Sequence, residues 1–454
     1  MRFDTNNFYK GAVTRLLSLA DAERMAGVSV PEYKYDLERM FDFAQYLELM
    51  QPPHVTVHVA GTKGKGSVAA MIESMVRSNG YRTGLYTSPH LHTFRERIKI
   101  DGVPVTEDLF AASLDRAWSY IESLNGSQQK FPTTFEMLTA MAMDLFKREQ
   151  IDVAILEVGL GGRLDATNVF PTDVAVITSI SLDHTAILGP TLSDIAHEKI
   201  GIVKRAQPVI SAPQSPEAQQ VIESKCLKVN AQLLQIQKDT IFQLDSAGLS
   251  GQKIAVVTPK HEYNCNLPLL GKHQAENAAV AITAVEQIPL ELNFEQMVLG
   301  INSVKWDGRF QILSENPYLI VDGAHNPYSM QKLGMTIKEY FPKSNVSLIF
   351  GASMDKQLDL LISEAETFAN KIYIVTSRHP RAASPSYLEK FFLNNDVNKQ
   401  IMGEVKKTLI TASHEASDND VIVVTGSLFV VAEALEWYFE ISPEWYPELS
   451  LSRS

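Results

Sequence analysis

A glycine-rich loop that contains two lysines and a serine follows an alternating apolar run near the start of the chain. The loop reads Gly61-Thr-Lys-Gly-Lys-Gly-Ser67, and a pattern with helical spacing follows it directly. Glycines let backbone N–H groups curl around phosphate oxygens, and the N-terminus of a helix favours anions. Lys65 would neutralise the outer phosphates, and the Ser67 hydroxyl would hold Mg²⁺. A plain glycine-rich turn with a solvated lysine is the alternative interpretation, because the spacing departs from G-x-x-x-x-G-K-[ST].

A carboxylate and a histidine follow two further predicted strands. Glu157 ends the apolar run that begins at residue 152, and His184 comes shortly after the apolar run 173–178. In open α/β sheets ligands bind beyond the carboxyl ends of the strands. If the two strands are neighbours, His184 lies beside Glu157, and with Ser67 they predict a metal site. A glutamate that caps a neighbouring backbone group and a structural histidine are the alternatives.

Other polar clusters lie at strand or helix ends farther along the chain. Arg309 and the segment Asp322-Gly-Ala-His325 flank a predicted strand. An arginine that reaches a nucleotide from a second domain would supply positive charge to phosphoryl transfer, whereas an interdomain salt bridge is the alternative role. Asn277 lies on a helix that begins near residue 271, and Lys199 ends an amphipathic helix. Taken alone, Asn277 could bond a ligand or a backbone group, and Lys199 is typical of a solvated face.

The elements that would position these residues alternate between strands and helices. Apolar runs without alternation, such as 152–157 and 173–178, are typical of parallel strands buried on both faces. Helical spacing covers residues 133–148. A second series begins near Arg309, with strands at 318–322, 346–350, 371–375 and 421–425 and helices at 327–340 and 428–438. We expect an α/β protein with a mostly parallel sheet in residues 1–304, a small antiparallel excursion within 231–259, and a smaller Rossmann-like α/β domain in residues 305–454.

Composition excludes several classes of protein. Of the 454 residues 41 are Lys or Arg and 53 are Asp or Glu, so the net charge of −12 argues against a broad surface that binds nucleic acid. Two cysteines are too few for a disulfide framework or a cysteine zinc site. The first residues lack the apolar stretch of a signal peptide, and the longest apolar stretch, 421–435, is too short and too interrupted to span a bilayer. We expect a cytoplasmic protein without a membrane partner.

Taken together, the motifs closely resemble the folylpolyglutamate synthase/dihydrofolate synthase family of the Mur ligase superfamily. The resemblance covers most of the chain in order. Its motifs are the loop 61–67, Tyr86-Thr-Ser-Pro-His-Leu91, 157–168, Leu182-Asp-His184, Glu198-Lys-Ile-Gly201, 271–277, 306–310, 322–327 and Thr425-Gly-Ser-Leu428. Lys63 departs from many bacterial members, which carry Asn there, although other members carry Lys.

The resemblance implies an ATP-dependent ligation of L-glutamate to a reduced folate or dihydropteroate carboxylate. It assigns nucleotide binding to the loop and to four later residues: Gly61, Thr62, Lys63, Gly64, Lys65, Gly66, Ser67, Asn277, Arg309, Asp322 and His325. It assigns two Mg²⁺ ions to Ser67, Ser88, Glu157 and His184. Lys65, Lys199 and His184 become the catalytic residues, and Lys199 matches the position of a carbamylated lysine that adds an anion beside the second metal ion.

Two rival functions stay open at this point. Another Mur-type ligase would use the same chemistry on a uridine-diphosphate sugar. An ATP-binding switch would hydrolyse ATP in the absence of both glutamate and a pterin acid. The resemblance implies small-molecule substrates and a monomer, and the sequence itself excludes no dimer. It does not distinguish a monofunctional from a bifunctional enzyme, and it fixes neither the folate form nor the length of the glutamate tail.

Overall fold

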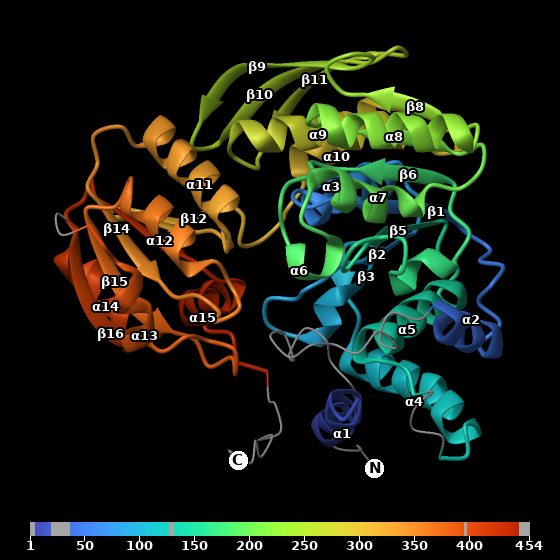
Figure 1. The fold of residues 1–454 in the computed structure, drawn as a ribbon, viewed down its shortest axis with the longest axis horizontal. Helices are drawn as coiled ribbons and strands as arrows, with labels where there is room; N and C mark the ends of the chain where they lie inside the picture. Colours follow the sequence, from blue (N-terminus) through green and yellow to red (C-terminus); the bar gives the residue numbers. More distant parts are fainter. Residues whose placement is uncertain (1–4, 20–36, 127–130, 395–396, 445–454) are drawn as a thin grey trace.

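The computed structural model describes residues 5–19, 37–126, 131–394 and 397–444. Its chain forms two α/β domains that lie side by side, with a small antiparallel sheet above their junction in the view of Figure 1. The N-terminal domain contains α1 to α10 and β1 to β11, and the C-terminal domain contains β12 to β17 and α11 to α15. Residues 304–310 connect α10 to β12. The predicted combination of two α/β units is confirmed.

The N-terminal domain is built on an eight-stranded sheet in the order β4-β3-β2-β5-β1-β6-β7-β8. The six strands β2, β5, β1, β6, β7 and β8 pair in parallel, whereas β3 and β4 form an antiparallel edge. The strands are β1 (Val55–Ala60), β2 (Thr83–Tyr86), β3 (Ile98–Ile100), β4 (Val103–Pro104), β5 (Val153–Glu157), β6 (Val174–Ile177), β7 (Pro208–Ser211) and β8 (Gln232–Gln235). β1 lies between β5 and β6, so three buried strands end along one edge of the sheet.

Helices cover both faces of this sheet because its central strands are apolar on both sides. The helices are α1 (Thr5–Leu17), α2 (Leu37–Tyr46), α3 (Lys65–Ser78), α4 (Glu107–Ser123), α5 (Thr134–Arg148), α6 (Thr185–Leu188), α7 (Leu192–Lys199), α8 (Pro216–Lys228), α9 (Lys272–Val285) and α10 (Phe294–Ser303). One face packs on α3, α9 and α10. The other packs on α1, α2, α4 and α5 at one end and on α7 and α8 at the other.

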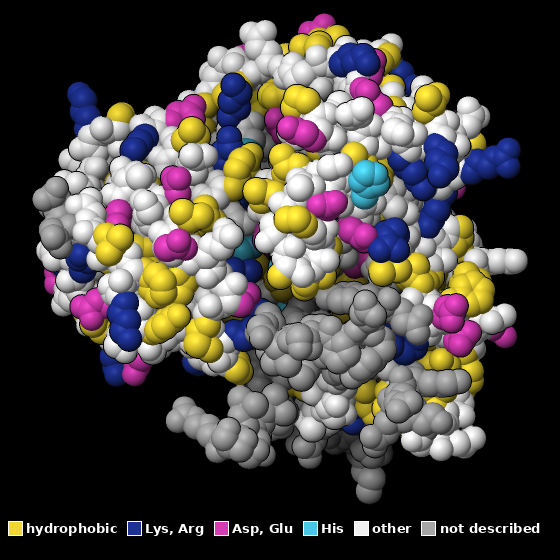
Figure 2. All heavy atoms as spheres, viewed as in Figure 1, with side chains coloured by type: hydrophobic (Ala, Val, Ile, Leu, Met, Phe, Trp, Pro, Cys, Tyr) yellow, Lys and Arg dark blue, Asp and Glu magenta, His cyan; other side chains and the backbone are white. Residues whose placement is uncertain are grey.

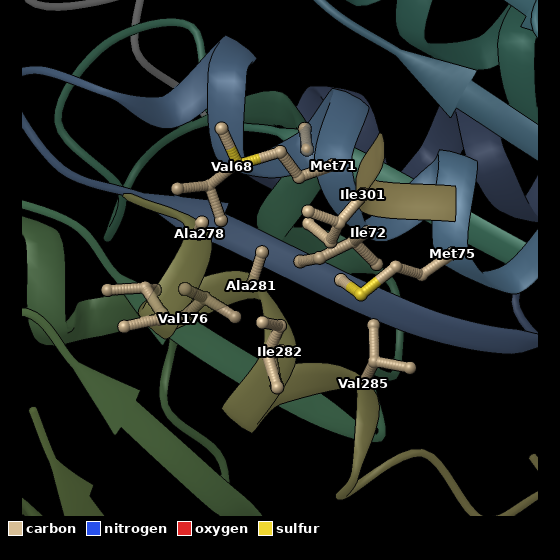
Figure 3. Packing of buried hydrophobic residues seen from close by; sticks show 14 of the residues in the cluster. Val68, Met71, Ile72, Met75, Val176, Ala278, Ala281, Ile282, Val285 and Ile301 are labelled. Carbon is tan, nitrogen blue, oxygen red and sulfur yellow. The ribbon is translucent and has the colours of Figure 1, made fainter. Parts of the chain in front are cut away.

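The helix that follows the glycine loop is enclosed on several sides. Figure 3 shows Met71, Ile72 and Met75 of α3 facing Ile282 of α9, and all four side chains are fully buried. On another side α10 approaches α3 closely at Gly300, where an added Cβ atom would lie 2.5 Å from the Cα of Met75. The position of α3, and therefore of the loop at its N-terminus, is set by close packing.

A three-stranded antiparallel sheet crosses from the N-terminal domain toward the C-terminal one (Figure 1). Its strands are β9 (Ile241–Gly248), β10 (Gly251–Val257) and β11 (Glu262–Leu267). Leu249, in the turn between β9 and β10, packs with Leu270 against the core of the C-terminal domain. The prediction of a small antiparallel sheet in this region is confirmed, but its predicted bounds, residues 231–259, were wrong. Residues 232–235 join the large sheet as β8, and the small sheet extends to residue 267.

The C-terminal domain is a six-stranded sheet in the order β12-β13-β17-β14-β15-β16. Only β12 is antiparallel to its neighbour. The strands are β12 (Gln311–Glu315), β13 (Tyr318–Val321), β14 (Val346–Phe350), β15 (Lys371–Thr376), β16 (Asn398–Glu404) and β17 (Val421–Thr425). The helices are α11 (Pro327–Tyr340), α12 (Leu358–Glu366), α13 (Pro385–Leu388), α14 (Val405–Glu415) and α15 (Leu428–Tyr438). α11 and α12 cover one face, and α14 and α15 cover the other.

The chain returns to the N-terminal domain after α15. The carboxylate of Glu444 accepts a hydrogen bond from the hydroxyl of Tyr9 on α1 and another from the backbone N–H of Phe94, at 3.0 Å. The C-terminal domain is thus attached to the N-terminal domain both where it begins and near its end. Among the described residues no helix is both long and apolar enough to cross a membrane.

The packing of α3 gives a first prediction. Ile72→Ala should lower the free energy of unfolding of the N-terminal domain by roughly 2–5 kcal/mol, because it removes buried methyl groups and leaves a cavity. Urea denaturation followed by fluorescence measures this loss. The control is Leu227→Ala, since Leu227 is 86% exposed and its removal should change stability by about 0.5 kcal/mol or less. Equal stability of the two variants would contradict the packing argument.

Candidate nucleotide and metal site

The glycine loop joins the carboxyl end of the central strand β1 to the N-terminus of α3. Gly64 is the residue that precedes the helix, and its φ of 89° lies in the left-handed region that glycine tolerates best. A Cβ atom at this position would lie 2.5 Å from the Oδ1 of Asn277. The tight turn therefore depends on glycine for both its backbone angle and its closeness to α9. The loop leaves backbone N–H groups at the positive end of α3, as an anion site requires.

Glu157 lies across from this loop at the end of β5. Its Oε1 is 3.9 Å from the Nζ of Lys65, and its Oε2 accepts the backbone N–H of Ser88 at 3.2 Å. Burial raises the pKa of Glu157, while the nearby Lys65 ammonium acts in the opposite direction. The carboxylate does cap a backbone group, as the alternative interpretation held. It still presents its other oxygen to the lysine of the loop.

The sheet order corrects one step of the sequence analysis. His184 was expected beside Glu157 on the condition that their strands are neighbours, but β1 lies between β5 and β6. His184 instead is the residue just before α6, with its Nε2 3.8 Å from the Oδ1 of Asp183. The His184 side chain is 46% exposed, so its desolvation is only partial; this desolvation and nearby lysines that include Lys65 lower the pKa of His184, and Asp183 opposes them. Glu157 and His184 therefore lie on either side of the strand that carries the loop, and a neutral imidazole is the form that binds metals.

Lys199 is buried rather than solvated, which overturns the interpretation from its spacing alone. It is the last residue of α7 and only 4% exposed, and its Nζ donates a hydrogen bond of 2.8 Å to the carbonyl oxygen of Gly61. Burial, together with the positive charge of Lys65, lowers the pKa of Lys199 to about 7. A large fraction of this amine is neutral near pH 7. The side chain thus touches the first residue of the loop.

α9 supports the other side of the loop. Asn277 donates to the Oε1 of Gln274 at 3.0 Å, and the Nε2 of Gln274 lies 3.4 Å from the Oγ of Ser67. Asn277, Gln274 and Ser67 are all buried. This chain of polar groups orients the serine at the start of α3.

The C-terminal domain contributes a second set of polar groups. Asp322 follows β13 and accepts the backbone N–H groups of Phe310 and Ala324, each at 2.8 Å. Burial raises the pKa of Asp322, and the Arg309 guanidinium acts in the opposite direction. Phe310 has a φ of 41°, so Asp322 holds a strained turn that presents Arg309. The Nη1 of Arg309 donates to the carbonyl oxygen of Gly308 at 3.1 Å, and its positive charge also acts to lower the pKa of Glu157 in the N-terminal domain, so the alternative role in an interdomain charge interaction stays open.

His325 follows Asp322 and faces the N-terminal domain. Its Nδ1 lies 2.8 Å from the carbonyl oxygen of Gly323. Burial, with the charges of Lys63 and Lys356, holds the pKa of His325 well below its ordinary range. Lys63 belongs to the glycine loop, so the two domains meet at this point. Figure 2 shows the furrow between the domains, with Lys or Arg and His side chains within it.

Comparisons with known proteins identify the family of this chain. The model of the Mur ligase middle domain matches residues 59–285, and that of the Mur ligase glutamate ligase domain matches residues 308–428. The dihydrofolate synthase/folylpolyglutamate synthase of Bacillus subtilis is 34% identical over 383 residues, which are 83% of this chain and 88% of that protein. The chain belongs to the folylpolyglutamate synthase/dihydrofolate synthase family of Mur ligases.

Solved structures of relatives share the whole fold of the ligase. The Escherichia coli FolC protein in complex with DHPP and ADP superposes with a TM-score of 0.82 at 32% identity, covering 94% of this chain and 98% of that one. The bifunctional folylpolyglutamate synthase/dihydrofolate synthase of Yersinia pestis, complexed with AMPPNP and a Mn ion, gives a TM-score of 0.80 at 30% identity, covering 91% and 95%. The chain is an ATP-dependent ligase that works with a divalent metal ion.

The donors in this ligase fit Mg²⁺ only as part of a larger complex. Within the described ranges no group of three or more His, Cys, Asp or Glu side chains could hold a metal ion. Glu157, the Ser67 hydroxyl and Ser88 instead offer a few hard oxygen donors beside the loop. Mg²⁺ commonly binds one or two carboxylates and completes its shell with substrate phosphates and water. The residues therefore fit a metal ion that arrives with the nucleotide.

Sequence reasoning missed three residues that the structure brings into the site. Asp183 pairs with Lys63 at 2.8 Å, Asn326 donates to Asp183 at 3.1 Å, and Lys356 lies close enough to influence His184 and His325. Asp183 and Asn326 lie inside the motifs Leu182-Asp-His184 and 322–327, so their positions were visible. Their partners were not, because the contacts join segments that are far apart in the chain.

The geometry of the loop gives a second prediction. Gly64→Ala should raise the dissociation constant for ATP at least about tenfold, because it adds left-handed strain of about 1–2 kcal/mol and a clash with Asn277. Isothermal titration calorimetry measures the constant. The control is Gly80→Ala, since Gly80 has a similar φ of 87° with no atom within 4 Å of an added Cβ. Unchanged affinity in Gly64→Ala would exclude the loop from the nucleotide site.

Proposed function

We propose that the ligase uses ATP to join L-glutamate to the carboxylate of a reduced folate or of dihydropteroate, through an acyl phosphate. One observation carries the assignment of the site. The loop lysine Lys65 lies 3.9 Å from the buried carboxylate of Glu157, at the edge of the sheet where the two domains meet. This arrangement matches what transfer of a phosphoryl group requires, namely a phosphate cradle, a carboxylate for a metal ion, and cations from a second domain.

Activation is needed because a carboxylate is a poor electrophile and lacks a good leaving group. Transfer of the γ-phosphoryl group of ATP to the carboxylate oxygen forms the acyl phosphate and ADP. The glutamate amine then attacks the acyl carbon, the tetrahedral intermediate expels phosphate, and the amine loses a proton to give the amide. No side-chain nucleophile takes part. A groove between two domains suits this chemistry because water would hydrolyse the acyl phosphate.

The roles that we propose for the residues come from the family resemblance and are compatible with their positions. The loop residues Gly61, Thr62, Lys63, Gly64, Lys65, Gly66 and Ser67 bind the phosphates of ATP, and Asn277, Arg309, Asp322 and His325 complete the nucleotide site. Lys65 and Arg309 offset the charge that develops on the transferred group. Ser67, Ser88, Glu157 and His184 would hold two Mg²⁺ ions, whose chemistry is to neutralise phosphoryl oxygens and fix their orientation.

We also propose a division into residues 1–304 and 305–454. The connection 304–310 and the limits of the two matching family models support it. We infer that the enzyme acts as a monomer in the cytoplasm, because one chain supplies every residue of the candidate site and ATP is made inside the cell.

The substrate is tested by mass spectrometry of the products. The enzyme is incubated with ATP, Mg²⁺ and L-glutamate together with dihydropteroate or tetrahydrofolate. One added glutamate on dihydropteroate indicates dihydrofolate synthase activity, and addition to tetrahydrofolate indicates polyglutamylation. Lys65→Ala should lower either rate by at least about a hundredfold, because it removes the charge that stabilises the phosphoryl group. ATP hydrolysis without dependence on glutamate or a pterin acid would contradict the ligase assignment.

Carbamylation of Lys199 is a separate part of the proposal. The neutral amine would attack CO₂, form an N–C bond and release a proton, giving an anion beside the second metal ion. Because the pKa of Lys199 is about 7, the neutral fraction grows as pH rises through 7. Enzyme depleted of CO₂ should therefore regain activity on addition of bicarbonate, and to a greater extent at pH 8 than at pH 6.

Lys199→Ala should lower the rate of ligation at least about tenfold, as the loss of groups that support metal ligands does. Lys228→Ala, which changes an exposed lysine on α8, should leave it unchanged. A near wild-type rate for Lys199→Ala at ambient CO₂ would rule out this role.

A further inference from the structure

The carboxylate of Asp183 joins the glycine loop to the C-terminal domain. Its Oδ2 accepts hydrogen bonds from the Nζ of Lys63 at 2.8 Å and from the Nδ2 of Asn326 at 3.1 Å. Lys63 belongs to the loop after β1, and Asn326 belongs to the C-terminal domain. A single oxygen atom therefore contacts both domains.

Both partners of Asp183 are held firmly in their own domains. Asn326 is 8% exposed and caps α11, with its Oδ1 accepting the backbone N–H of Ser329 at 2.9 Å. On the other side, the backbone N–H of Thr62 donates to the carbonyl oxygen of Ser179 at 2.9 Å. The hydroxyl of Thr62 also donates to the carbonyl oxygen of Ser181 at 3.1 Å. The loop and the segment that carries Asp183 thus move as one unit.

The charged groups around Asp183 strengthen its contact with Lys63. Although burial favours the neutral acid, Lys63 and His184 hold the pKa of Asp183 well below its ordinary range. Burial in turn lowers the pKa of Lys63 to about 8, with Lys65 and Lys356 acting in the same direction and Asp183 opposing. Three lysines from two domains therefore lie close together, and Asp183 supplies an anion among them. A polyphosphate bound to the loop would add the negative charge that this cluster needs.

We propose that Asp183 is a positioning residue that couples occupancy of the glycine loop to the position of the C-terminal domain. The Asp183–Asn326 contact stabilises the closed arrangement that brings Arg309 and His325 to the nucleotide. Coupling between two equilibria is reciprocal, so nucleotide in the loop stabilises the contact by the same factor. This inference rests on the proposal that the loop binds ATP. Lys63 completes the link, because it contacts Asp183 directly.

Asn326→Asp tests the coupling with little change in shape. An aspartate at this position keeps the helix cap, since its oxygen can accept the Ser329 N–H. It replaces the amide donor with a second carboxylate that faces Asp183. Asn293→Asp is the matched control, because Asn293 caps α10 in the same way and donates no side-chain bond to the C-terminal domain among the described contacts. Asn326→Ser, which keeps a cap but lacks the amide, serves if the charged variant fails to fold.

The readout is the distance between the domains, measured by pulsed electron paramagnetic resonance. Spin labels are attached to Lys228→Cys on α8 and Lys407→Cys on α14, both on exposed positions, while the native cysteines are buried. Without nucleotide, Asn326→Asp should shift the ratio of closed to open molecules about tenfold toward open, as coupled neighbours commonly allow. Its dissociation constant for a non-hydrolysable ATP analogue with Mg²⁺ should rise by a similar factor. Asn293→Asp should match the wild type in both measurements.

The exchanged pair Asp183→Asn with Asn326→Asp provides the rescue. The double variant restores an amide and a carboxylate that face one another, so a larger fraction of its molecules should be closed than in Asn326→Asp alone. If the two residues had merely structural roles, the second substitution would instead add its own effect to that of the first. Distance distributions that are equal in the wild type, Asn326→Asp and Asn326→Ser would overturn the proposal. Failure of the wild type to bind the analogue would instead refute the assignment of the loop, and the distances without nucleotide would still decide the role of Asp183.

Discussion

The position of β1 between β5 and β6 is the constraint on which the site depends. Parallel strands end at the same edge of a sheet, so the glycine loop after β1 emerges between Glu157 at the end of β5 and the segment that follows β6. α3 fixes the direction of the loop because it is packed between the sheet, α9 and α10. The C-terminal domain then needs only to approach this one edge. No loop of unusual length is required to assemble the groups.

Burial gives these groups properties that they would lack in water. The amine of Lys199 and the ammonium of Lys63 lose hydration, and the pKa of each falls, whereas the pKa of Glu157 rises. An enclosed site strengthens every remaining charge interaction. A phosphate chain bound at the loop would favour the charged forms of these lysines, because its negative charge would offset the cost of their burial. The gathering of lysines at the loop therefore favours a polyanion over a neutral ligand.

Much of the fold could be predicted from local patterns. Helices α11 and α15 lie where the sequence placed them, and Pro327 and Thr133 mark helix starts through ordinary capping chemistry. The order of the strands could not be predicted, because pairing depends on which buried faces meet, and the expectation that placed His184 beside Glu157 depended on it. The burial of Lys199 could not be predicted for a related reason. A lysine at a helix end gives the same sequence pattern whether its ammonium group donates a hydrogen bond to water or to the carbonyl oxygen of Gly61.

The site shows the same division between local and distant information. For residues in a continuous motif, such as Lys65 and Ser67, the spacing alone is enough to predict a role in phosphate binding. The contact between Asp183 and Asn326 spans 143 positions, and neither residue is unusual in its own surroundings. Family resemblance supplied roles for residues but no distances. Only the folded chain shows that the loop and the second domain share one carboxylate.

The contact of Glu444 with Tyr9 and Phe94 has a mechanical consequence. A rigid body that is fixed at one point can turn about three axes, but a body that is held at two separate points can turn about only the line that joins them. The C-terminal domain is held by the connection 304–310 and again by Glu444. While both attachments persist, its motion reduces to a swing along one arc. Such a hinge returns His325, which lies in the C-terminal domain beyond the connection, to the same place on every closure, without a search through orientations.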